Sequence, residues 1–168
     1  FKDLKTENVQ LKKKISTDEK YISLVGNSDK MKEVYARIEM VSKSDVSVLV
    51  TGESGTGKEL VSREIHRNST RINNPYLQIN CAAIPENLVE SSLFGYEKGA
   101  FTGALKTTNG VFQEANLGSL LLDEVTEIPV SMQAKLLRVL QEKAVARVGS
   151  HEHQNIDVRI ISTSNRNV

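Results

Sequence analysis

The sequence has few of the residues that mark secreted or membrane proteins. Cys81 is its only cysteine, and tryptophan is absent. One cysteine excludes an intrachain disulfide framework and fits a reducing compartment, so we expect Cys81 to be a small buried residue. No apolar run approaches the roughly 20 residues of a membrane-spanning helix, and the first residues do not open a signal peptide. We therefore expect a cytoplasmic segment without membrane contact, starting inside a longer protein because its first residue is not methionine.

The chain also lacks an excess of charge of either sign. It has 22 lysine and arginine residues against 21 aspartate and glutamate residues, for a formal net charge of +1. A nucleic-acid-binding segment usually carries a basic excess, so contact with DNA would have to come from residues outside this chain. The 168 residues are 39% hydrophobic and 26% charged, which is typical of a globular domain that can bury a core.

Residues 1–20 differ from the rest of the chain. They are polar and lysine-rich, without glycine or proline, and their apolar residues recur at helix-like spacings. A linker helix that pairs with another copy of itself and a solvated, frayed terminus fit this pattern equally well. We take residues 1–20 as a linker helix and residues 21–168 as the folded domain.

Two kinds of apolar segment alternate along residues 21–168. Short runs rich in branched residues predict four buried strands, at residues 46–50, 76–79, 120–122 and 157–163. Segments with helical periodicity lie before and between them: residues 31–41 with Ser28 as N-cap, residues 58–67, a short helix with Pro85 at its first position, and a helix capped by Ser131. This order predicts an α/β fold with a doubly wound parallel sheet.

A glycine-rich loop follows the first predicted strand. Gly52-Glu53-Ser54-Gly55-Thr56-Gly57-Lys58 matches the phosphate-binding pattern G-x-x-x-x-G-K, and a predicted helix follows it. Glycines let successive backbone N–H groups turn toward phosphate oxygens, the helix N-terminus adds partial positive charge, and Lys58 adds a full charge. We therefore expect nucleotide phosphates to bind here, rather than an ordinary turn. Glu59 stands where a serine or threonine hydroxyl usually binds Mg²⁺.

Two acidic residues end the third predicted strand. Asp123 and Glu124 follow a run of three leucines, so in a parallel sheet they lie at the same edge as the phosphate loop. An isolated Asp-Glu pair is usually a surface feature, but together with the phosphate loop it predicts a hydrolytic nucleotide site. We expect Asp123 to hold Mg²⁺ and Glu124 to polarise the attacking water.

The most specific motif lies in a glycine-rich and threonine-rich stretch, residues 95–110, that has no clear period. Gly99-Ala100-Phe101-Thr102-Gly103-Ala104 is identical to the signature loop of the sigma-54-dependent transcriptional activators, the bacterial enhancer-binding proteins of the nitrogen-regulator C type. Such a hexapeptide occurs by chance at about one in ten million positions, so coincidence is a poor explanation. The chain resembles this family over roughly residues 25–168. Other matching segments are residues 52–59, 79–83, 93–98, 136–141, 147–149 and 157–159.

The resemblance implies the AAA+ ATPase domain that interacts with sigma-54, working in the bacterial cytoplasm as a homo-oligomeric ring, commonly a hexamer. In that family, ATP hydrolysis moves the loop of residues 99–104. The loop contacts the sigma-54 factor bound to RNA polymerase and drives promoter opening, which activates transcription. Phe101 has no apolar periodicity around it, so an exposed contact residue fits better than a core aromatic. Whether a two-component system or a ligand controls the protein is left open.

The resemblance also assigns roles to single residues. It places Val25 and Gly26 beside the nucleotide, and it makes Asn80 the residue that holds Glu124 away from water until a partner is engaged. Asn165, together with Ser164, falls where the family senses the γ-phosphate. Glutamate is the family's own residue at position 59, so Glu59 does not weaken the ATP and Mg²⁺ assignment.

Several parts of the family's fold are expected after Val168. They are the fifth strand of the sheet, the helical lid, the arginine fingers that reach a neighbouring subunit, and a C-terminal domain that binds enhancer DNA. The fold is therefore expected to be a partial AAA+ domain, with the strand at residues 46–50 at an open edge. The match does not identify Arg147, Arg159 or Arg166 as a finger.

Six positions depart from the usual family pattern: Ser92, Tyr96, Val111, Leu117, Ser164 and Asn167. Val111 stands in place of an arginine near the signature loop, which puts the coupling of that loop to the nucleotide in doubt. Leu117 stands in place of a glycine. None of the groups assigned to phosphate or Mg²⁺ is lost.

Other interpretations compete with an ATPase. A nucleotide-gated binding module without useful hydrolysis would share the same motifs, whereas a GTPase would need an Asn-Lys-x-Asp segment that this chain lacks. His151 and His153 suggest a metal site without a third ligand, so a polar hairpin tip is favoured. We interpret the cluster of basic residues between positions 63 and 71 as a solvated helix face.

Overall fold

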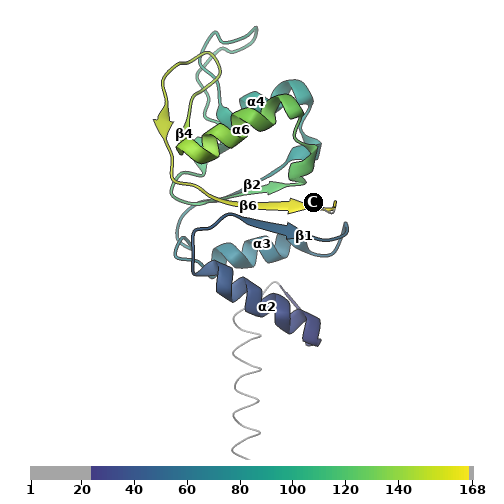
Figure 1. Cartoon of the computed structure of the whole chain (residues 1–168). Helices are drawn as coiled ribbons and strands as arrows, with labels where there is room; N and C mark the ends of the chain where they lie inside the picture. The colour runs from purple at the N-terminus through teal and green to yellow at the C-terminus, as the bar shows by residue number, and fades with distance from the viewer. Residues whose placement is uncertain (1–23, 167–168) are drawn as a thin grey trace, which may run out of the picture.

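A parallel sheet forms the centre of the computed structural model, which describes residues 24–166 (Figure 1). The spatial order of its four strands is β1-β6-β3-β2. Their bounds are β1 Val48–Thr51, β2 Tyr76–Asn80, β3 Ser119–Asp123 and β6 Arg159–Ser164. Because β6, the last strand in sequence, lies between β1 and β3, the sheet has the interleaved order that a doubly wound fold requires. The predicted linker helix, residues 1–20, lies outside the described residues.

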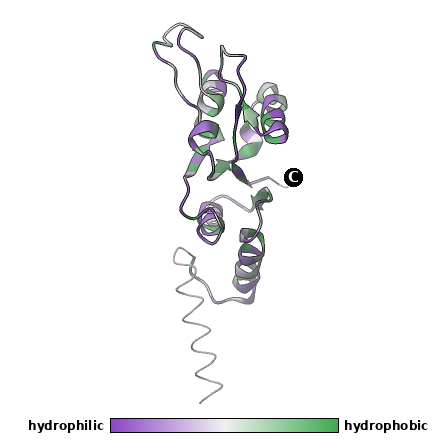
Figure 2. Cartoon of the chain, turned by 90° about the vertical axis from the view of Figure 1, so that its left-hand side faces the viewer, coloured by the Kyte–Doolittle hydropathy of each residue, from purple (hydrophilic) through white to green (hydrophobic). Residues whose placement is uncertain are grey.

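Helices cover both faces of this sheet. Figure 1 shows α2 and α3 on one face and α4 and α6 on the other. The helix bounds are α2 Asp29–Ser42, α3 Lys58–Arg67, α4 Glu86–Phe94, α5 Val111–Glu114 and α6 Val130–Glu142. Figure 2 shows hydrophilic and hydrophobic residues on each helix, as expected for amphipathic helices packed on a sheet. Within residues 24–166, every helix is too short or too polar to span a bilayer.

Strand β3 explains why the core has two layers. Successive side chains of a strand point to opposite faces, so Leu121 belongs to one layer and its two leucine neighbours belong to the other. Leu120 and Leu122 pack with residues of α4, α5 and α6, whereas Leu121 packs with Ile38 and Ile65 from the helices on the opposite face. All three leucines are at most 1% exposed, which is typical of a parallel strand covered on both sides.

Strand β1 lies at one edge of the sheet, as the resemblance implied. It pairs with β6 alone among the described strands, with Val48 opposite Ile161 and Thr51 opposite Ser164. Leu49 is 47% exposed although it is a large aliphatic residue in a strand. Within the described residues, the face of β1 that carries Leu49 is therefore incompletely covered.

Three local predictions were wrong or incomplete. Pro85 is the N-cap of α4 rather than its first residue, and α6 begins after Pro129 rather than after Ser131. In both cases the proline has a φ of −54° and an extended ψ, which ends the preceding segment just ahead of the helix. A short antiparallel hairpin, β4 Ala144–Val145 with β5 Gln154–Asn155, follows α6 and was predicted only as a polar tip. The one-turn helix α5 was not predicted.

Candidate functional site

The glycine-rich loop connects β1 to α3, as the sequence predicts. Gly55 and Gly57 have φ values of 79° and 85°, in the left-handed region that favours glycine. Gly57 is the N-cap of α3, and the helix start has no side-chain cap. The first N–H groups of α3 are therefore free of a competing side chain, which suits them to an anion such as a phosphate.

Lys58 reaches back across this loop. Its ammonium group donates hydrogen bonds to the carbonyl oxygens of Gly52, at 2.9 Å, and Glu53, at 2.8 Å. The hydroxyl of Thr56 donates to the carbonyl of Glu53 as well, at 2.8 Å. These bonds close the loop around the Lys58 charge, so the donors needed for phosphate binding are already gathered. Glu59 pairs with Arg63 at 3.1 Å along the exposed side of α3.

Asp123 and Glu124 lie at the same edge of the sheet as the loop. Strand β6 separates β3 from β1, so the acids stand two strand spacings, about 10 Å, from the end of β1. That gap is wide enough for the phosphates of a nucleotide and a cation between the loop and the acids. Glu124 has a φ of 53°, which is unusual for a residue other than glycine, and it turns the chain away from the sheet.

Asn80 is in register with Asp123 on the neighbouring strand. Its side-chain nitrogen donates to Oδ2 of Asp123 over a long 3.4 Å, and its side-chain oxygen accepts the N–H groups of Ala82 and Ala83. Among the described residues, no hydrogen bond joins Asn80 to Glu124. The proposed hold of Asn80 on Glu124 stays a prediction.

The end of β6 completes this edge of the sheet. Ser164 is fully buried, its carbonyl accepts the N–H of Gly52 at 3.2 Å, and its hydroxyl bonds with the backbone of Arg166. Asn165 is exposed beside it. The predicted γ-phosphate sensor therefore lies directly against the first glycine of the phosphate loop.

Val25 and Gly26 approach the domain from its N-terminal side. Val25 is 96% exposed. The Tyr35 hydroxyl contacts the carbonyl oxygens of Leu24 and Gly26 at 3.2 Å each, so α2 holds this segment in place. Their contact with a nucleotide remains a prediction. Helical periodicity indicated only that Tyr35 faces the core, whereas the structure shows that its hydroxyl also anchors this segment.

The signature loop, Gly99–Ala104, projects from the layer of α4 and α6, well away from the phosphate loop (Figure 1). Phe101 is 44% exposed and its ring packs on that of Tyr96, with centroids 4.9 Å apart. The loop is therefore a presented surface with an aromatic residue supported from below, as the absence of apolar periodicity predicted.

A hairpin loop, residues 146–153, supports the base of the signature loop. Arg147 pairs with Glu97 at 3.0 Å, and the hydroxyl of Thr107 donates to the same carboxylate at 2.6 Å. These two hydrogen bonds, with that from Thr107 first, hold the pKa of Glu97 below its ordinary value. A Cβ at Gly149 would lie 2.9 Å from the Ala100 side chain, so the two loops touch.

Comparison with known proteins agrees with this geometry. The sigma-54 interaction domain model matches residues 24–168. The chain belongs to the sigma-54 interaction domain family. It is 47% identical to the regulatory protein AtoC of Escherichia coli over 168 residues, which is 100% of this chain and 36% of AtoC.

Solved structures support the same placement. NtrX from Brucella abortus in complex with ATP matches with a TM-score of 0.79 and 39% identity, over 96% of this chain and 36% of that one. The P-loop NTPase domain of an E. coli sigma-54 activator matches at a TM-score of 0.54 and 14% identity, over 84% and 79% of the two chains, which supports the fold. The domain therefore has the AAA+ P-loop NTPase fold of a transcriptional activator, and it spans about a third of the length of AtoC and NtrX.

One departure from the usual family pattern has a clear physical meaning in this sigma-54 interaction domain. Leu117 has a φ of 66°, in the left-handed region, so the glycine common at this position suits the backbone better. The other described positions that differ from the usual family residue do not displace the phosphate loop, Asp123 or Glu124. Asn167 lies outside the described residues.

The interpretation of the basic cluster as a solvated helix face holds for Arg63, which is exposed on α3, but is wrong for His66 and Arg71. His66 and Arg71 are only 5% and 8% exposed. Arg71 lies beyond the end of α3 and binds both carboxylate oxygens of Asp45, at 3.0 and 2.9 Å, and Asp157 at 2.8 Å. Sequence spacing cannot show this, because the acidic partners are 26 and 86 positions away.

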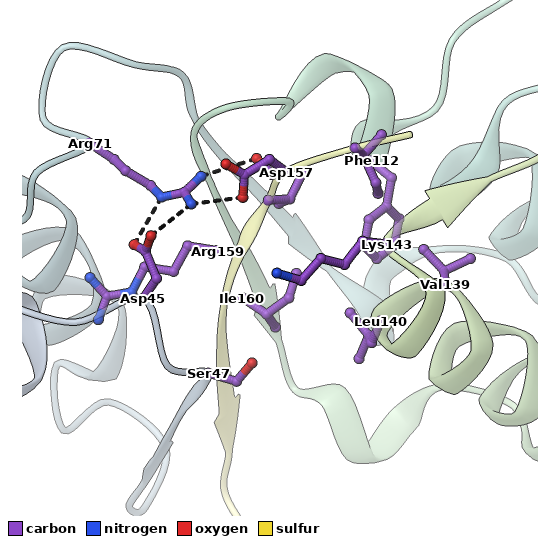
Figure 3. A pocket seen from close by; sticks show the side chains of 12 residues that line it. Asp45, Ser47, Arg71, Phe112, Val139, Leu140, Lys143, Asp157, Arg159 and Ile160 are labelled. Carbon is purple, nitrogen blue, oxygen red and sulfur yellow. Dashed lines mark hydrogen bonds and ion pairs between the residues drawn. The ribbon is translucent and has the colours of Figure 1, made fainter. Parts of the chain in front are cut away.

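These ion pairs border a cavity of about 470 Å³ at the amino ends of the strands, opposite the phosphate loop (Figure 3). Figure 3 shows Arg71 between Asp45 and Asp157, with Lys143 extending toward them. The hydrogen bonds that Arg71 donates to the two carboxylates, that to Asp45 first, raise the pKa of Arg71. Three cationic and two anionic side chains line the cavity, and both carboxylates are already paired with Arg71.

Other candidate sites carry no chemistry of their own. Within residues 24–166, no group of three histidine, cysteine or acidic residues is arranged to hold a metal, and His151 and His153 are exposed at the hairpin tip. Cys81 is 4% exposed, and burial raises the pKa of its thiol to about 11. A thiol with that pKa is a poor nucleophile at neutral pH, so Cys81 is a core residue as predicted.

Proposed function

We propose that this domain binds ATP with Mg²⁺, hydrolyses it, and uses the hydrolysis to move its signature loop against sigma-54. The observation that carries the proposal is the arrangement of one sheet edge. The uncapped start of α3 and the charge of Lys58 face the same edge as Asp123 and Glu124, two strands away. An anion site opposite a pair of carboxylates is what ATP hydrolysis requires.

The residues present fit a Mg·ATP complex. The backbone of residues 52–57 and Lys58 would hold the phosphates, and Asp123 would hold Mg²⁺, directly or through water. When bound, Mg²⁺ neutralises charge on the phosphates. Glu124 would accept a proton from the attacking water, and Asn165 would respond to the γ-phosphate. That the relative NtrX was solved with ATP supports the choice of nucleotide.

The output side of the proposal is sigma-54 contact. Thr102 and the 44% exposed Phe101 would touch sigma-54 in the RNA polymerase holoenzyme, and their movement would open promoter DNA. Enhancer DNA would be bound by another domain, since this chain has no basic excess. The working form is proposed to be a ring, commonly a hexamer, in which a neighbouring subunit supplies an arginine to each site.

One observation favours a second candidate for the chain by itself. The three arginines considered as fingers are all engaged: Arg147 with Glu97, Arg166 with Glu127 at 2.7 Å, and Arg159 buried at 1% exposure. None of these three is both exposed and without an ion pair. An arginine finger is worth about 10³–10⁵ in rate, so the isolated chain would act as a nucleotide-gated binding module without useful hydrolysis.

Two measurements test these functions. In a full-length protein that contains this chain, Thr102→Ala should leave ATP turnover within about twofold of wild type, because Thr102 is remote from the phosphate loop, and should abolish promoter opening. Normal promoter opening by this variant would refute the contact role. Turnover per subunit should rise with protein concentration in the full-length protein and stay negligible for the 168-residue chain. Efficient hydrolysis by the monomeric chain would refute the need for a neighbour.

A further inference from the structure

Thr163 on β6 makes two hydrogen bonds at the catalytic edge. Its hydroxyl is bonded to Oδ1 of Asp123, and it accepts the backbone N–H of Glu124 at 3.0 Å. The residue is completely buried. Among residues 24–166, Thr163 is therefore the only side chain that hydrogen-bonds to both acids of the site.

The direction of these bonds follows from the groups involved. An ionised carboxylate can only accept a hydrogen bond, and a backbone N–H can only donate one. The single hydroxyl proton of Thr163 must therefore go to Asp123, and its lone pair must receive the N–H of Glu124. The chain of bonds runs from the Glu124 backbone through Thr163 to the Asp123 carboxylate.

The sheet places Thr163 where this bridge is possible. The register of β3 against β6 ends with Leu122 opposite Ser162, so Thr163 is the next residue along β6, level with Asp123. Threonine is branched at Cβ, which restricts its χ1 rotamers, and full burial in a central strand leaves it little freedom to move. Its hydroxyl is therefore a fixed point to which the carboxyl end of β3 is hydrogen-bonded.

The hydrogen bond with Thr163 matters more for Glu124 than for Asp123. With a φ of 53° it occupies a backbone conformation that costs energy for a residue with a side chain. The neighbouring acid is restrained on both of its oxygens, by Thr163 on one and by the long contact with Asn80 on the other. Without the hydroxyl, a backbone N–H at Glu124 and one oxygen of Asp123 would lose their partners.

We propose that Thr163 is a positioning residue for ATP hydrolysis, whose hydroxyl sets the Asp123 carboxylate and the Glu124 backbone together. This inference rests on the proposed ATPase function. It assigns Thr163 no contact with nucleotide or water, and it predicts that the hydroxyl matters more than the shape of the side chain. Because Asp123 is the proposed Mg²⁺ ligand, the same hydroxyl should also influence how well Mg²⁺ strengthens nucleotide binding.

Four variants in a full-length protein containing this chain separate the effect of the hydroxyl from that of side-chain shape. Thr163→Val keeps the branched shape and removes the hydroxyl, whereas Thr163→Ser keeps the hydroxyl and removes the methyl group. Ser162→Ala is the matched control, because it deletes a hydroxyl from the adjacent residue, which points to the other face of the sheet. Thr163→Ala provides a second hydroxyl-free variant if the valine variant does not fold.

The expected pattern is a split between variants and between kinetic constants. Thr163→Val and Thr163→Ala should lower kcat for ATP by about 10–100-fold, the scale of a misplaced catalytic group, with KM changed by less than about threefold. Thr163→Ser should retain kcat within about threefold, and Ser162→Ala should match wild type. Equal loss in the serine and valine variants would show that packing, not the hydroxyl, is responsible, and would overturn the proposal.

A binding measurement gives a readout independent of turnover. The affinity of a fluorescent ATP analogue should rise on adding Mg²⁺ in wild type and in Thr163→Ser, and should rise by less in Thr163→Val. An identical Mg²⁺ effect in wild type and Thr163→Val would contradict the proposed hold on Asp123.

Failure of the broader function has a different signature. If the wild-type protein bound no ATP, or if it turned over ATP normally with Glu124 replaced by glutamine, the ATPase assignment itself would fall. If wild type hydrolysed ATP, the Glu124 variant did not, and Thr163→Val equalled wild type, only the role of Thr163 would be wrong.

Discussion

The two ends of strand β3 are built in opposite ways. At its carboxyl end, Asp123 and Glu124 face an uncapped helix start and a loop of glycines, and the groups suited to ligand binding are left accessible. At its amino end, Arg71 is surrounded by carboxylates and carbonyl oxygens that belong to the chain itself. The carboxyl end is organised for something that binds there, whereas the amino end is satisfied internally.

Both ends also contain a residue with a left-handed backbone. Leu117 lies two residues before β3 and Glu124 directly after it, with φ values of 66° and 53°. The strain at Glu124 aims an acid at the proposed site, whereas Leu117 is an exposed side chain with no such role. Changes at the carboxyl end should therefore alter chemistry, and changes at the amino end should alter stability.

The largest effect is expected at Glu124. Glu124→Gln keeps the shape and removes the proton acceptor, so ATP turnover should fall by about 10²–10⁴-fold while ATP affinity changes little. Steady-state kinetics and nucleotide titration of a full-length protein containing this chain measure the two quantities. Glu114→Gln, at an exposed acid on α5, is the control and should behave as wild type. Persistent turnover in the Glu124 variant would remove it as the base.

Lys58 tests the phosphate loop at the same end. Lys58→Ala should weaken ATP binding by about 10–100-fold, because it removes a charged donor facing the phosphates. The exposed Lys30, mutated to alanine, controls for the loss of one positive charge. Unchanged affinity in a titration of the Lys58 variant would mean that the phosphates bind elsewhere.

Arg71 tests the amino end. Arg71→Met should lower the free energy of unfolding by about 2–3 kcal/mol, because several carbonyl and carboxylate groups lose their hydrogen-bond donor. The two carboxylates are half-exposed and can bind water instead, so the loss is smaller than for a fully buried ion pair. Arg138→Met removes an exposed partner of Glu142 and should change stability by less than about 0.5 kcal/mol. Denaturant unfolding measures both, and equal effects would show that burial at Arg71 is unimportant.

The buried His66, also at the amino end of β3, should make the stability of the domain depend on pH. Burial, and then the charge of Arg159, holds the pKa of His66 below its ordinary value. The unfolded chain therefore binds a proton that the folded chain resists, so stability is full above about pH 6.5 and falls as pH drops below it, by at most about 1.4 kcal/mol per pH unit.

Chemical unfolding between pH 8 and pH 5 measures this dependence. His66→Asn should flatten the pH dependence, because asparagine does not titrate in this range. Asparagine can still hydrogen-bond to the hydroxyl of Ser119, which lies 3.0 Å from Nδ1 of His66. His151→Asn, at the exposed hairpin tip, should leave it unchanged. A His66→Asn protein with the wild-type slope would assign the dependence to other groups.

The smallest effect is expected at Leu117. Leu117→Gly should raise the free energy of unfolding by about 0.5 kcal/mol, because relief of left-handed strain slightly exceeds the backbone entropy cost of glycine. Leu117→Ala keeps the Cβ atom and should give no gain. If alanine and glycine were equally stabilising, the effect would come from removing an exposed leucine rather than from the backbone.

The elements of this domain could be predicted from sequence where their signals are local. The β-branched run before Gly52, the loop itself and the leucines before Asp123 each fix an element through adjacent residues, and the strands appear within a residue or two of the predicted positions. The short hairpin and α5 were missed because two-residue strands and a single helical turn leave no periodic pattern.

The phosphate loop, the pair of acids and the signature loop, and with them the family, can be recognised without a structure, because each motif is a contiguous run of residues. The distant residues that meet these motifs become visible only in the folded domain. Thr163 reaches Asp123 from 40 positions away, and Arg71 meets Asp157 from 86 positions away. Such pairs arise because parallel strands bring remote segments into register, and nothing in the spacing of either partner records the other.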